Sequence, residues 1–497
     1  MGIGSSGQSG AGFGNGSGRM ASRGLRWCRR HSAAGLTAVV VFAGSAVIPP
    51  VAQAQQAPSG SAANHTNSLG QADELSSIVN PGDDRTFYEL DPAVDLAAAQ
   101  PGDVLRQREI SLHLAGLATP VRVTQLQYRT TDTQGRPEFN VTSVLHPTAP
   151  ADGRVVAYQS AYDSLNAADG PSRSLSGNFS LGGGIATAET AVMLPILQSG
   201  ASVVMADTEG VDANFAAGPE YGMATIDSLR AAKNAEVGGV REDSPVAMIG
   251  YSGGAIATNW ASILMNDYAP ELRPSIVGAA QGGLLVNPLN NLTYAIEGPL
   301  WSGVVLMAIV GLARAYEIDI DPYLTETGKY FADEMEDASI IDGFGRLAGM
   351  SWEDLVKSEY PAPLDVPPIK EIVDKVNMGT APVPDIPMLL VQGGGGFIEL
   401  TPPGGENAGA GDGVMVAGDV RALAHRYCEA GTPIVYREYP IASHVMAGIP
   451  YALETLGWVN DRFAGVPAPN NCGTYPAGND LTRGGHGGTF PVPISQS

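Results

Sequence analysis

The feature that most constrains this chain is a series of short apolar runs that alternate with segments of helical periodicity. The apolar runs cover residues 155–159, 202–206, 246–250, 276–280 and 388–392. The helical segments cover residues 221–235, 254–266 and 418–429. Short runs that are apolar on both faces are typical of buried parallel strands. The pattern predicts an α/β fold: a mainly parallel sheet with helices on both faces.

Two further segments have a different pattern. Residues 121–129 and 140–145 alternate β-branched and polar residues around a turn at 132–135, which predicts an antiparallel hairpin before the parallel part. Between residues 284 and 376 the strand-like runs stop, and we expect an inserted helical cap. Its helix-like segments cover residues 300–316, 322–336, 340–348 and 352–358.

The most apolar run of the expected cap, residues 304–310, has two interpretations. It is either a buried cap helix or an apolar wall over a lipid-binding cleft, and the pattern alone does not separate them. It is too short to be a membrane span, which needs about 20 residues.

The N-terminal segment resembles an export signal. Residues 1–54 contain five arginines and no acidic residue, and an apolar run at 33–47 is followed by Ala52-Gln53-Ala54. This order of a basic stretch, an apolar run and a small-x-small site is typical of a cleaved signal peptide. We expect cleavage near Ala54 and a secreted protein, outside the cell or in its envelope.

These observations divide the chain into six expected parts. They are a signal peptide (1–54), a flexible lead-in (55–85), the first part of the core (86–283), the helical cap (284–376), the second part of the core (377–472) and a Gly/Pro-rich tail (473–497).

Charge and cysteine content exclude several classes of function. The chain has 28 Lys and Arg against 51 Asp and Glu, a net charge of −23, which repels nucleic acid and anionic surfaces. No Cys-x-x-Cys occurs among the three cysteines, so no structural zinc site is expected.

Signal cleavage removes Cys28 and leaves Cys428 and Cys472, which predicts one disulfide in an oxidising compartment. That bond ties the tail, which otherwise has little to hold it, to a helix.

Gly250-Tyr251-Ser252-Gly253-Gly254 carries the strongest chemical signal. It joins a predicted strand to a predicted helix, the context of a nucleophile elbow, in which small neighbours let a serine project from a sharp turn. The alternative is an ordinary glycine-rich strand-to-helix turn. We interpret Ser252 as a nucleophile.

A nucleophilic serine needs a base, and in this fold the histidine comes after the serine in the chain. His425 lies inside a predicted helix and His486 in the tail, whereas His444 follows the predicted strand 433–439 by a short loop. His444 is therefore the expected base.

The acid that orients His444 is harder to assign, because the last strand before it is followed by four glycines, Gly393 to Gly396. The candidates are Glu399, Glu406, Asp412 and Asp419. Asp419 suits the first turn of a helix. We prefer Asp412 and interpret Asp207, which precedes the serine, as a loop residue.

From about residue 101 to 472 the chain resembles the secretory lipase family, the lipase A type of α/β-hydrolase. The matching pieces are residues 158–163, the elbow at 250–254, the helix at 419–428, Gly431-Thr-Pro433, Ser443-His444 and residues 458–465. Aligning the Asp419 helix with that of the family brings Asp412 onto the family's catalytic acid. The longer loop before Asp412 departs from the family pattern.

The resemblance implies an oxyanion hole made by the Gly253 amide, which the elbow itself also predicts, and by Asp163. It implies hydrolysis of lipid esters through an acyl-serine, with no cofactor or metal, an apolar acyl site under the cap and transient contact with a lipid interface. Two alternatives remain: a secreted acyltransferase using the same residues, and a non-catalytic scaffold that binds a lipid or a partner. A peptidase is a third, and the sequence does not indicate an oligomeric state.

Overall fold

A computed structural model describes residues 85–178, 180–404 and 408–482. The expected export signal, nearly all of the expected lead-in, Glu406 and His486 lie outside the described residues.

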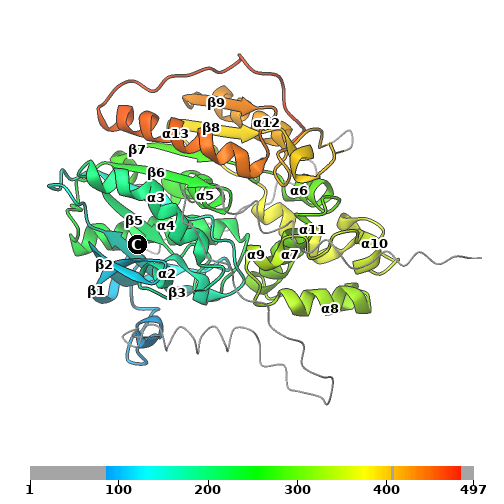
Figure 1. Ribbon diagram of the computed structural model, residues 1–497, viewed down its shortest axis with the longest axis horizontal. Helices are drawn as coiled ribbons and strands as arrows, with labels where there is room; N and C mark the ends of the chain where they lie inside the picture. The colour runs from blue at the N-terminus through cyan, green and yellow to red at the C-terminus, as the bar shows by residue number, and fades with distance from the viewer. Residues whose placement is uncertain (1–84, 179, 405–407, 483–497) are drawn as a thin grey trace, which may run out of the picture. The chain divides into compact units, whose positions relative to one another are not determined.

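The core is a nine-stranded sheet in the order β1-β2-β3-β5-β4-β6-β7-β8-β9 (Figure 1). The strands are β1 (Val104–Leu114), β2 (Leu117–Thr131), β3 (Pro137–Leu145), β4 (Val155–Gln159), β5 (Ser202–Ala206), β6 (Val246–Tyr251), β7 (Ile276–Gly282), β8 (Met388–Gly393) and β9 (Ile434–Tyr439). Strands β5, β4, β6, β7, β8 and β9 pair in parallel. The predicted parallel sheet is confirmed.

The first three strands form an antiparallel meander. Strands β2 and β3 pair around the turn predicted at residues 132–135, with Thr131 opposite Pro137. Strand β3 then joins the parallel part by pairing antiparallel with β5. The predicted hairpin is therefore present, and β1 extends it by one strand.

Alternate residues of the parallel strands pack against helices on opposite faces. On one face, Ala157, Met248 and Leu390 belong to the apolar cluster that includes α4 (Gly218–Ala235), α5 (Gly253–Tyr268) and α12 (Ala417–Glu429). On the other, strand residues such as Ile249 and Val391 pack with α3 (Gly184–Gln198) and α13 (His444–Phe463). Because both faces are covered, the strands are apolar throughout, as their sequences indicated.

A third apolar cluster lies mainly in the region between β7 and β8. Its helices are α6 (Pro288–Ala295), α7 (Ser302–Ala315), α8 (Glu326–Met335), α9 (Ile340–Gly343), α10 (Trp352–Leu355) and α11 (Pro367–Val376). The helices predicted at 340–348 and 352–358 are single turns, each begun by a serine whose side chain and a following aspartate form a capping box. No helix in the described part of the chain is long and apolar enough to cross a membrane.

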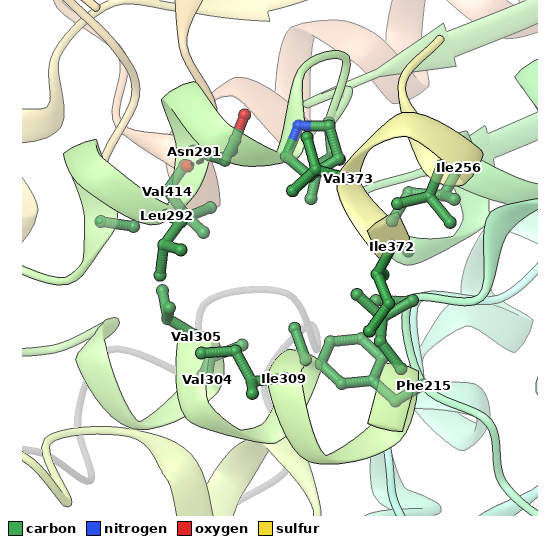
Figure 2. A pocket seen from close by; sticks show the side chains of 18 of the residues that line it. Phe215, Ile256, Asn291, Leu292, Val304, Val305, Ile309, Ile372, Val373 and Val414 are labelled. Atoms are coloured by element: carbon green, nitrogen blue, oxygen red, sulfur yellow. Dashed lines mark hydrogen bonds between the residues drawn. The ribbon is translucent and has the colours of Figure 1, made fainter. Parts of the chain in front are cut away.

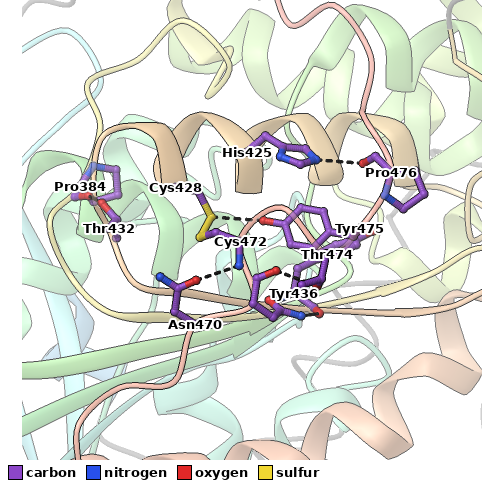
Figure 3. Close-up of a disulfide and its surroundings, with 11 residues drawn as sticks. Pro384, His425, Cys428, Thr432, Tyr436, Asn470, Cys472, Thr474, Tyr475 and Pro476 are labelled. Carbon is purple, nitrogen blue, oxygen red and sulfur yellow. Dashed lines mark hydrogen bonds between the residues drawn. A yellow bond between two sulfur atoms is a disulfide. The ribbon is translucent and has the colours of Figure 1, made fainter.

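The predicted disulfide joins Cys428 of α12 to Cys472 (Figure 3). Next to it, Asn471 hydrogen-bonds along the outer strand β9, donating its backbone N–H to the Ile434 carbonyl (3.0 Å) and accepting from the Tyr436 N–H through its side chain (2.9 Å). This segment therefore covers the edge of the sheet.

The sequence predicts the disulfide as the main attachment of the tail, but the structure shows further contacts. Through residue 482 it packs along α12, where the Asn479 side chain donates to Asp419 Oδ1 (2.7 Å). Leu481 is buried in the core, and its carbonyl accepts from Asn377 Nδ2 (3.1 Å).

Candidate active site

Ser252 stands between the last residue of β6 and the first residue of α5. Its backbone has φ 55° and ψ −121°, a strained conformation for a residue with a side chain. The turn is possible because its neighbours are small: a Cβ at Gly254 would lie 2.1 Å from the Gln159 carbonyl oxygen. The sequence therefore forms the sharp strand-to-helix turn that the motif predicted.

The structure brings Ser252, His444 and Asp412 together. His444 Nε2 lies 2.8 Å from Ser252 Oγ, and His444 Nδ1 lies 2.8 Å from Asp412 Oδ2. All three are buried, with Asp412 fully inaccessible and Ser252 7% exposed. These residues come from loops after β6, β8 and β9, the carboxyl ends of parallel strands, which meet at one edge of the sheet.

Asp412 is held in place by donors to both of its oxygens. Gln392, the next-to-last residue of β8, donates from Nε2 to Oδ2 (2.8 Å), and the Met415 N–H donates to Oδ1 (2.8 Å). The His444 N–H also donates to the Asp412 carbonyl (2.7 Å). Asp419 lies elsewhere: its carboxylate accepts from the Asn290 and Asn479 side chains, joining α12 to α6 and to the tail.

The four glycines that end β8 and follow it, residues 393–396, let three backbone segments approach closely. The Gly395 N–H donates to the Ala442 carbonyl (2.9 Å), in the loop before His444, and the Gly396 N–H donates to the Gly411 carbonyl (2.8 Å), next to Asp412. A Cβ at Gly395 would lie 2.5 Å from the backbone of Ile441. The glycine run therefore braces the acid loop against the histidine loop.

His444 is the first residue of α13. Burial lowers its pKa, but the charge and hydrogen bond of Asp412, with the charges of Glu399 and Asp163, outweigh burial and raise it overall. The Tyr251 hydroxyl donates to the His444 carbonyl (2.5 Å). His425 lies away from this site, where its Nε2 is 2.9 Å from the Pro476 carbonyl beside the disulfide (Figure 3).

Glu399, one of the rejected acid candidates, lies beside His444 in another role. Its Oε1 accepts from the Val445 N–H (3.0 Å), and its Oε2 accepts from Trp301 Nε1 (2.8 Å). The Trp301 ring in turn meets the His444 ring edge to face, with centroids 5.2 Å apart. Sequence reasoning missed Trp301 because nothing in its local pattern marks it.

Gly253 and Asp163 lie together on the other side of Ser252. A Cβ at Gly253 would be 1.7 Å from Asp163 Oδ1, so the Asp163 carboxyl group occupies the space over this glycine. Asp163 has φ 35°, and burial raises its pKa to about 7. The Gly253 N–H is at the N-terminus of α5, where the helix dipole favours negative charge.

Two glutamates that the sequence did not single out, the buried Glu209 and the partly buried Glu189, hold the loop carrying Asp163. Glu189 of α3 accepts from Ser160 Oγ (2.5 Å) and from the Ala161 N–H (3.0 Å). Glu209 accepts from the Ser164 N–H (3.1 Å). Burial raises the pKa of Glu189 to about 7 and that of Glu209 well above its usual range. Glu209 follows a parallel strand closely, the one local signal that marks it.

Asp207 is a buried loop residue with a structural contact. Its Oδ1 accepts from the Ser172 N–H (2.8 Å), at the start of α2 (Pro171–Leu175). It makes no hydrogen bond to His444 among those of the described residues, as expected for a residue outside the triad.

An apolar cavity, partly open to solvent, extends from Ser252 into the cap. Figure 2 shows side chains that line it. Helices α6, α7 and α11 supply most of its wall, with Phe215 and Ile256 from the core. Aliphatic side chains dominate the lining: Leu292, Val304, Val305, Ala308, Ile309, Leu312, Ile369, Ile372, Val373 and Val414 are among them.

Both interpretations of residues 304–310 apply to helix α7, which is buried in the cap on one side and lines the cavity on the other. Val304, Val305, Ala308, Ile309 and Leu312 face the cavity. Leu306, Met307 and Val310 belong to the buried cluster of the cap without lining the cavity. The helix is apolar on nearly all sides because one side is a cavity wall and the other is core.

No group of three or more His, Cys, Asp or Glu that could hold a metal ion occurs among the described residues. What the site does contain is a hydroxyl, an imidazole and a carboxylate connected by hydrogen bonds, next to backbone amides at a helix N-terminus. This arrangement suits nucleophilic attack on a carbonyl carbon.

Comparison with known proteins agrees with this geometry. The family profile described as "Secretory lipase" matches residues 179–471. A probable inactive lipase of Mycobacterium tuberculosis is 30% identical over 78% of this chain and 83% of its own. Lipase 5 of Candida albicans is 29% identical over 78% of this chain and 82% of its own.

Solved structures are similar over most of the chain. Candida antarctica lipase A in its closed state has a TM-score of 0.66 at 27% identity, covering 84% of this chain and 93% of that one. The esterase LipA of Xanthomonas oryzae, at 15% identity and a TM-score of 0.53, shares the fold. The expected α/β-hydrolase fold is therefore confirmed.

Proposed function

Because this chain belongs to the secretory lipase family, we propose that it is an exported serine hydrolase that cleaves carboxylic esters of lipids through an acyl-serine intermediate. The observation that carries the proposal is the pair of 2.8 Å contacts joining Ser252 Oγ to His444 and His444 to Asp412, at the mouth of an apolar cavity. A hydrolase of soluble polar substrates would have little use for such a lining.

In the first half of the reaction, Ser252 Oγ attacks the ester carbonyl carbon while His444 Nε2 takes its proton. Asp412 accepts from His444 Nδ1–H and stabilises the imidazolium. The carbonyl oxygen becomes an oxyanion, which the Gly253 and Asp163 amides stabilise. Loss of one such donor typically costs about 10²–10³ in kcat. His444 then protonates the leaving alcohol as the carbon–oxygen bond breaks.

In the second half, water replaces the alcohol. His444 takes a proton from the water, whose oxygen attacks the acyl carbonyl, and a second oxyanion forms in the same place. Collapse of this intermediate returns the proton to Ser252 Oγ and releases the carboxylic acid. The acyl chain lies in the cavity lined by α6, α7 and α11, whose aliphatic side chains exclude water from it.

One relative is named a probable inactive lipase, so family membership alone does not decide whether this chain turns over substrate. The full set of Ser252, His444 and Asp412, each with its hydrogen-bond partner, supports turnover here. The unfavourable backbone of Ser252 supports it as well, because such strain persists where function needs it.

The test is hydrolysis of p-nitrophenyl esters, from acetate to palmitate, by the mature protein and by its Ser252→Ala variant. We expect activity on long chains and a loss of about 10⁴-fold or more in kcat in the variant, with an unchanged melting temperature. A peak at short chains indicates a carboxylesterase. New esters formed with an added alcohol, in place of free acid, indicate an acyltransferase. No Ser252-dependent turnover on any ester contradicts the proposal and favours a binding scaffold.

A further inference from the structure

The cap is joined to the core at the loop that carries Asp163. Residues 163–165, called the oxyanion loop below, run antiparallel to residues 338–340, called the cap segment, and Ser164 forms a β-bridge with Ser339. The cap segment follows α8 and ends at the first residue of α9. A piece of the cap therefore lies directly against the loop from which an oxyanion donor is expected.

Two backbone hydrogen bonds hold this bridge. The Ile340 N–H donates to the Asp163 carbonyl (2.9 Å), and the Leu165 N–H donates to the Ala338 carbonyl (2.9 Å). Asp163 has φ 35°, an unfavourable conformation for a residue with a side chain. Such a backbone persists only where its surroundings hold it firmly. The bond from Ile340 is one of the contacts that hold it.

Arg314, the next-to-last residue of α7, fastens the same bridge from the side. Through Nη1 it donates to the carbonyls of Leu165 (2.9 Å) and Asp212 (2.9 Å). Through Nη2 it donates to the carbonyl of Glu336. Its guanidinium group therefore joins the oxyanion loop, the loop after β5 and the end of α8, which a planar group with five N–H donors can do. Arg314 is not among the residues that line the acyl cavity.

We propose that Arg314 and the cap segment position the oxyanion hole, by holding the Asp163 peptide so that its N–H is directed at the developing negative charge. The inference rests on the proposed function, since it assumes that Ser252 forms a tetrahedral oxyanion. Glu209 holds the oxyanion loop from the core side, where it accepts from the Ser164 N–H (3.1 Å). The cap holds it from the opposite strand of the bridge. A donor fixed in advance needs no reorganisation when the charge develops.

A second arginine also joins the core to the cap, but away from the oxyanion loop. Arg136, in the turn between β2 and β3, pairs with Glu317, which follows α7 (2.6 Å). Replacing Arg136 therefore weakens the attachment of the cap while every bond to the oxyanion loop stays in place. It is the matched control for Arg314.

The test compares Arg314→Met and Arg136→Met with the parent protein in hydrolysis of p-nitrophenyl butyrate. We expect Arg314→Met to lower kcat by about 10- to 100-fold with KM nearly unchanged, since a misplacement of about 1 Å can cost this much. Arg136→Met should keep the parent kcat. Thermal unfolding of both variants shows whether stability differs. Equal losses of kcat in the two variants, or a change confined to KM, overturn the inference.

A gentler substitution tests the single hydrogen bond to Asp163. Proline is tolerated at the first position of a helix, and Ser339 before it is already extended (φ −84°, ψ 165°). Ile340→Pro therefore removes the N–H donor while α9 can still form. Ile340→Ala is its matched control, because it shortens the same buried side chain but keeps the N–H. The kcat of the proline variant should be about tenfold below that of the alanine variant, and equal values contradict the inference.

A pair of inhibitors separates this inference from the proposed function. With an alkyl trifluoromethyl ketone, Ser252 Oγ bonds to the carbonyl carbon, the carbonyl electron pair moves to the oxygen and His444 takes the proton, which leaves a hemiketal oxyanion in the hole. The methyl ketone of the same chain length binds without this addition. Arg314→Met should weaken binding of the trifluoromethyl ketone by about tenfold or more and leave the methyl ketone nearly unchanged.

Each outcome of the inhibitor test has one meaning. Equal weakening of both ketones in a protein that hydrolyses esters overturns the inference and leaves the proposed function in place. If the parent protein hydrolyses no ester, the proposed function is contradicted, and the comparison of the two ketones then decides the inference by itself.

Discussion

The two walls of the cavity are built in opposite ways. The core wall, at the carboxyl ends of the strands, carries Ser252, Gly253 and Asp163 beside apolar residues such as Phe215 and Ile256. Behind it, polar groups have fixed partners: both Asp412 oxygens accept hydrogen bonds, and Glu189 and Glu209 hold the Asp163 loop. The cap wall presents mainly aliphatic side chains from α6, α7 and α11, with Asn291 as a polar exception. Fixed hydrogen bonds determine where charge develops, whereas aliphatic contacts adapt to chain length. The core wall should therefore control rate, and the cap wall should control substrate choice.

The largest expected effect comes from the core wall. Asp412→Asn should lower kcat by about 10⁴-fold on short and long esters alike, because an amide in place of the carboxylate favours the wrong His444 tautomer. Asp419→Asn is the matched control: its carboxylate bonds to Asn290 and Asn479, so we expect loss of stability without loss of kcat. The measurement is kcat per titrated active site, with thermal unfolding alongside. The reverse result would mean that the acid is misassigned.

A smaller and selective effect is expected from the cap wall. Ala308 of α7 lines the cavity and is partly exposed within it. Ala308→Phe should lower kcat/KM for the palmitate ester by about 10- to 100-fold, the cost of a clash worth about 1–3 kcal/mol. The acetate ester, which does not reach this depth, serves as the internal control. An equal loss on both esters would contradict the expectation that the core wall controls rate and the cap wall controls substrate choice.

The smallest expected effect is that of replacing Glu399, whose carboxylate lies beside His444 and accepts a hydrogen bond from Trp301 of the cavity wall. Its charge, with those of Asp412 and Asp163, raises the pKa of His444. The base must be neutral to act, so the acid limb of kcat/KM follows this pKa. Glu399→Gln removes a negative charge and should move the acid limb to lower pH, with little change in rate at the optimum.

A matched variant tests whether this shift is specific. Glu454→Gln removes a carboxylate from α13, the helix that begins with His444, but this carboxylate pairs with Arg437 at the surface. Its pH profile should coincide with that of the parent protein. Equal profiles for the Glu399 and Glu454 variants would show that Glu399 supports only the packing of Trp301.

The reaction centre could be predicted from sequence to an unusual extent because it depends on local patterns. Ser252 lies in a short motif between a strand and a helix. Chain order leaves three histidines after it, and His444 is the one that closely follows a strand. Among the four candidate carboxylates after the strand 388–392, the sequence favours Asp412, and the family alignment supports that choice. Gln392, Glu189 and Glu209 escaped notice because each acts on a partner distant in sequence.

By itself the sequence determined the parallel sheet, the hairpin before it, the cap insertion and the cysteine pair, since hydrophobic period and composition are local properties. Only the tertiary structure decided which side of α7 faces the cavity, because that helix is apolar all round and its period carries no direction. Only the tertiary structure also explains the glycines at 393–396. Their backbone hydrogen-bonds to the loop before His444 and to the segment next to Asp412, and side chains there would prevent this close approach.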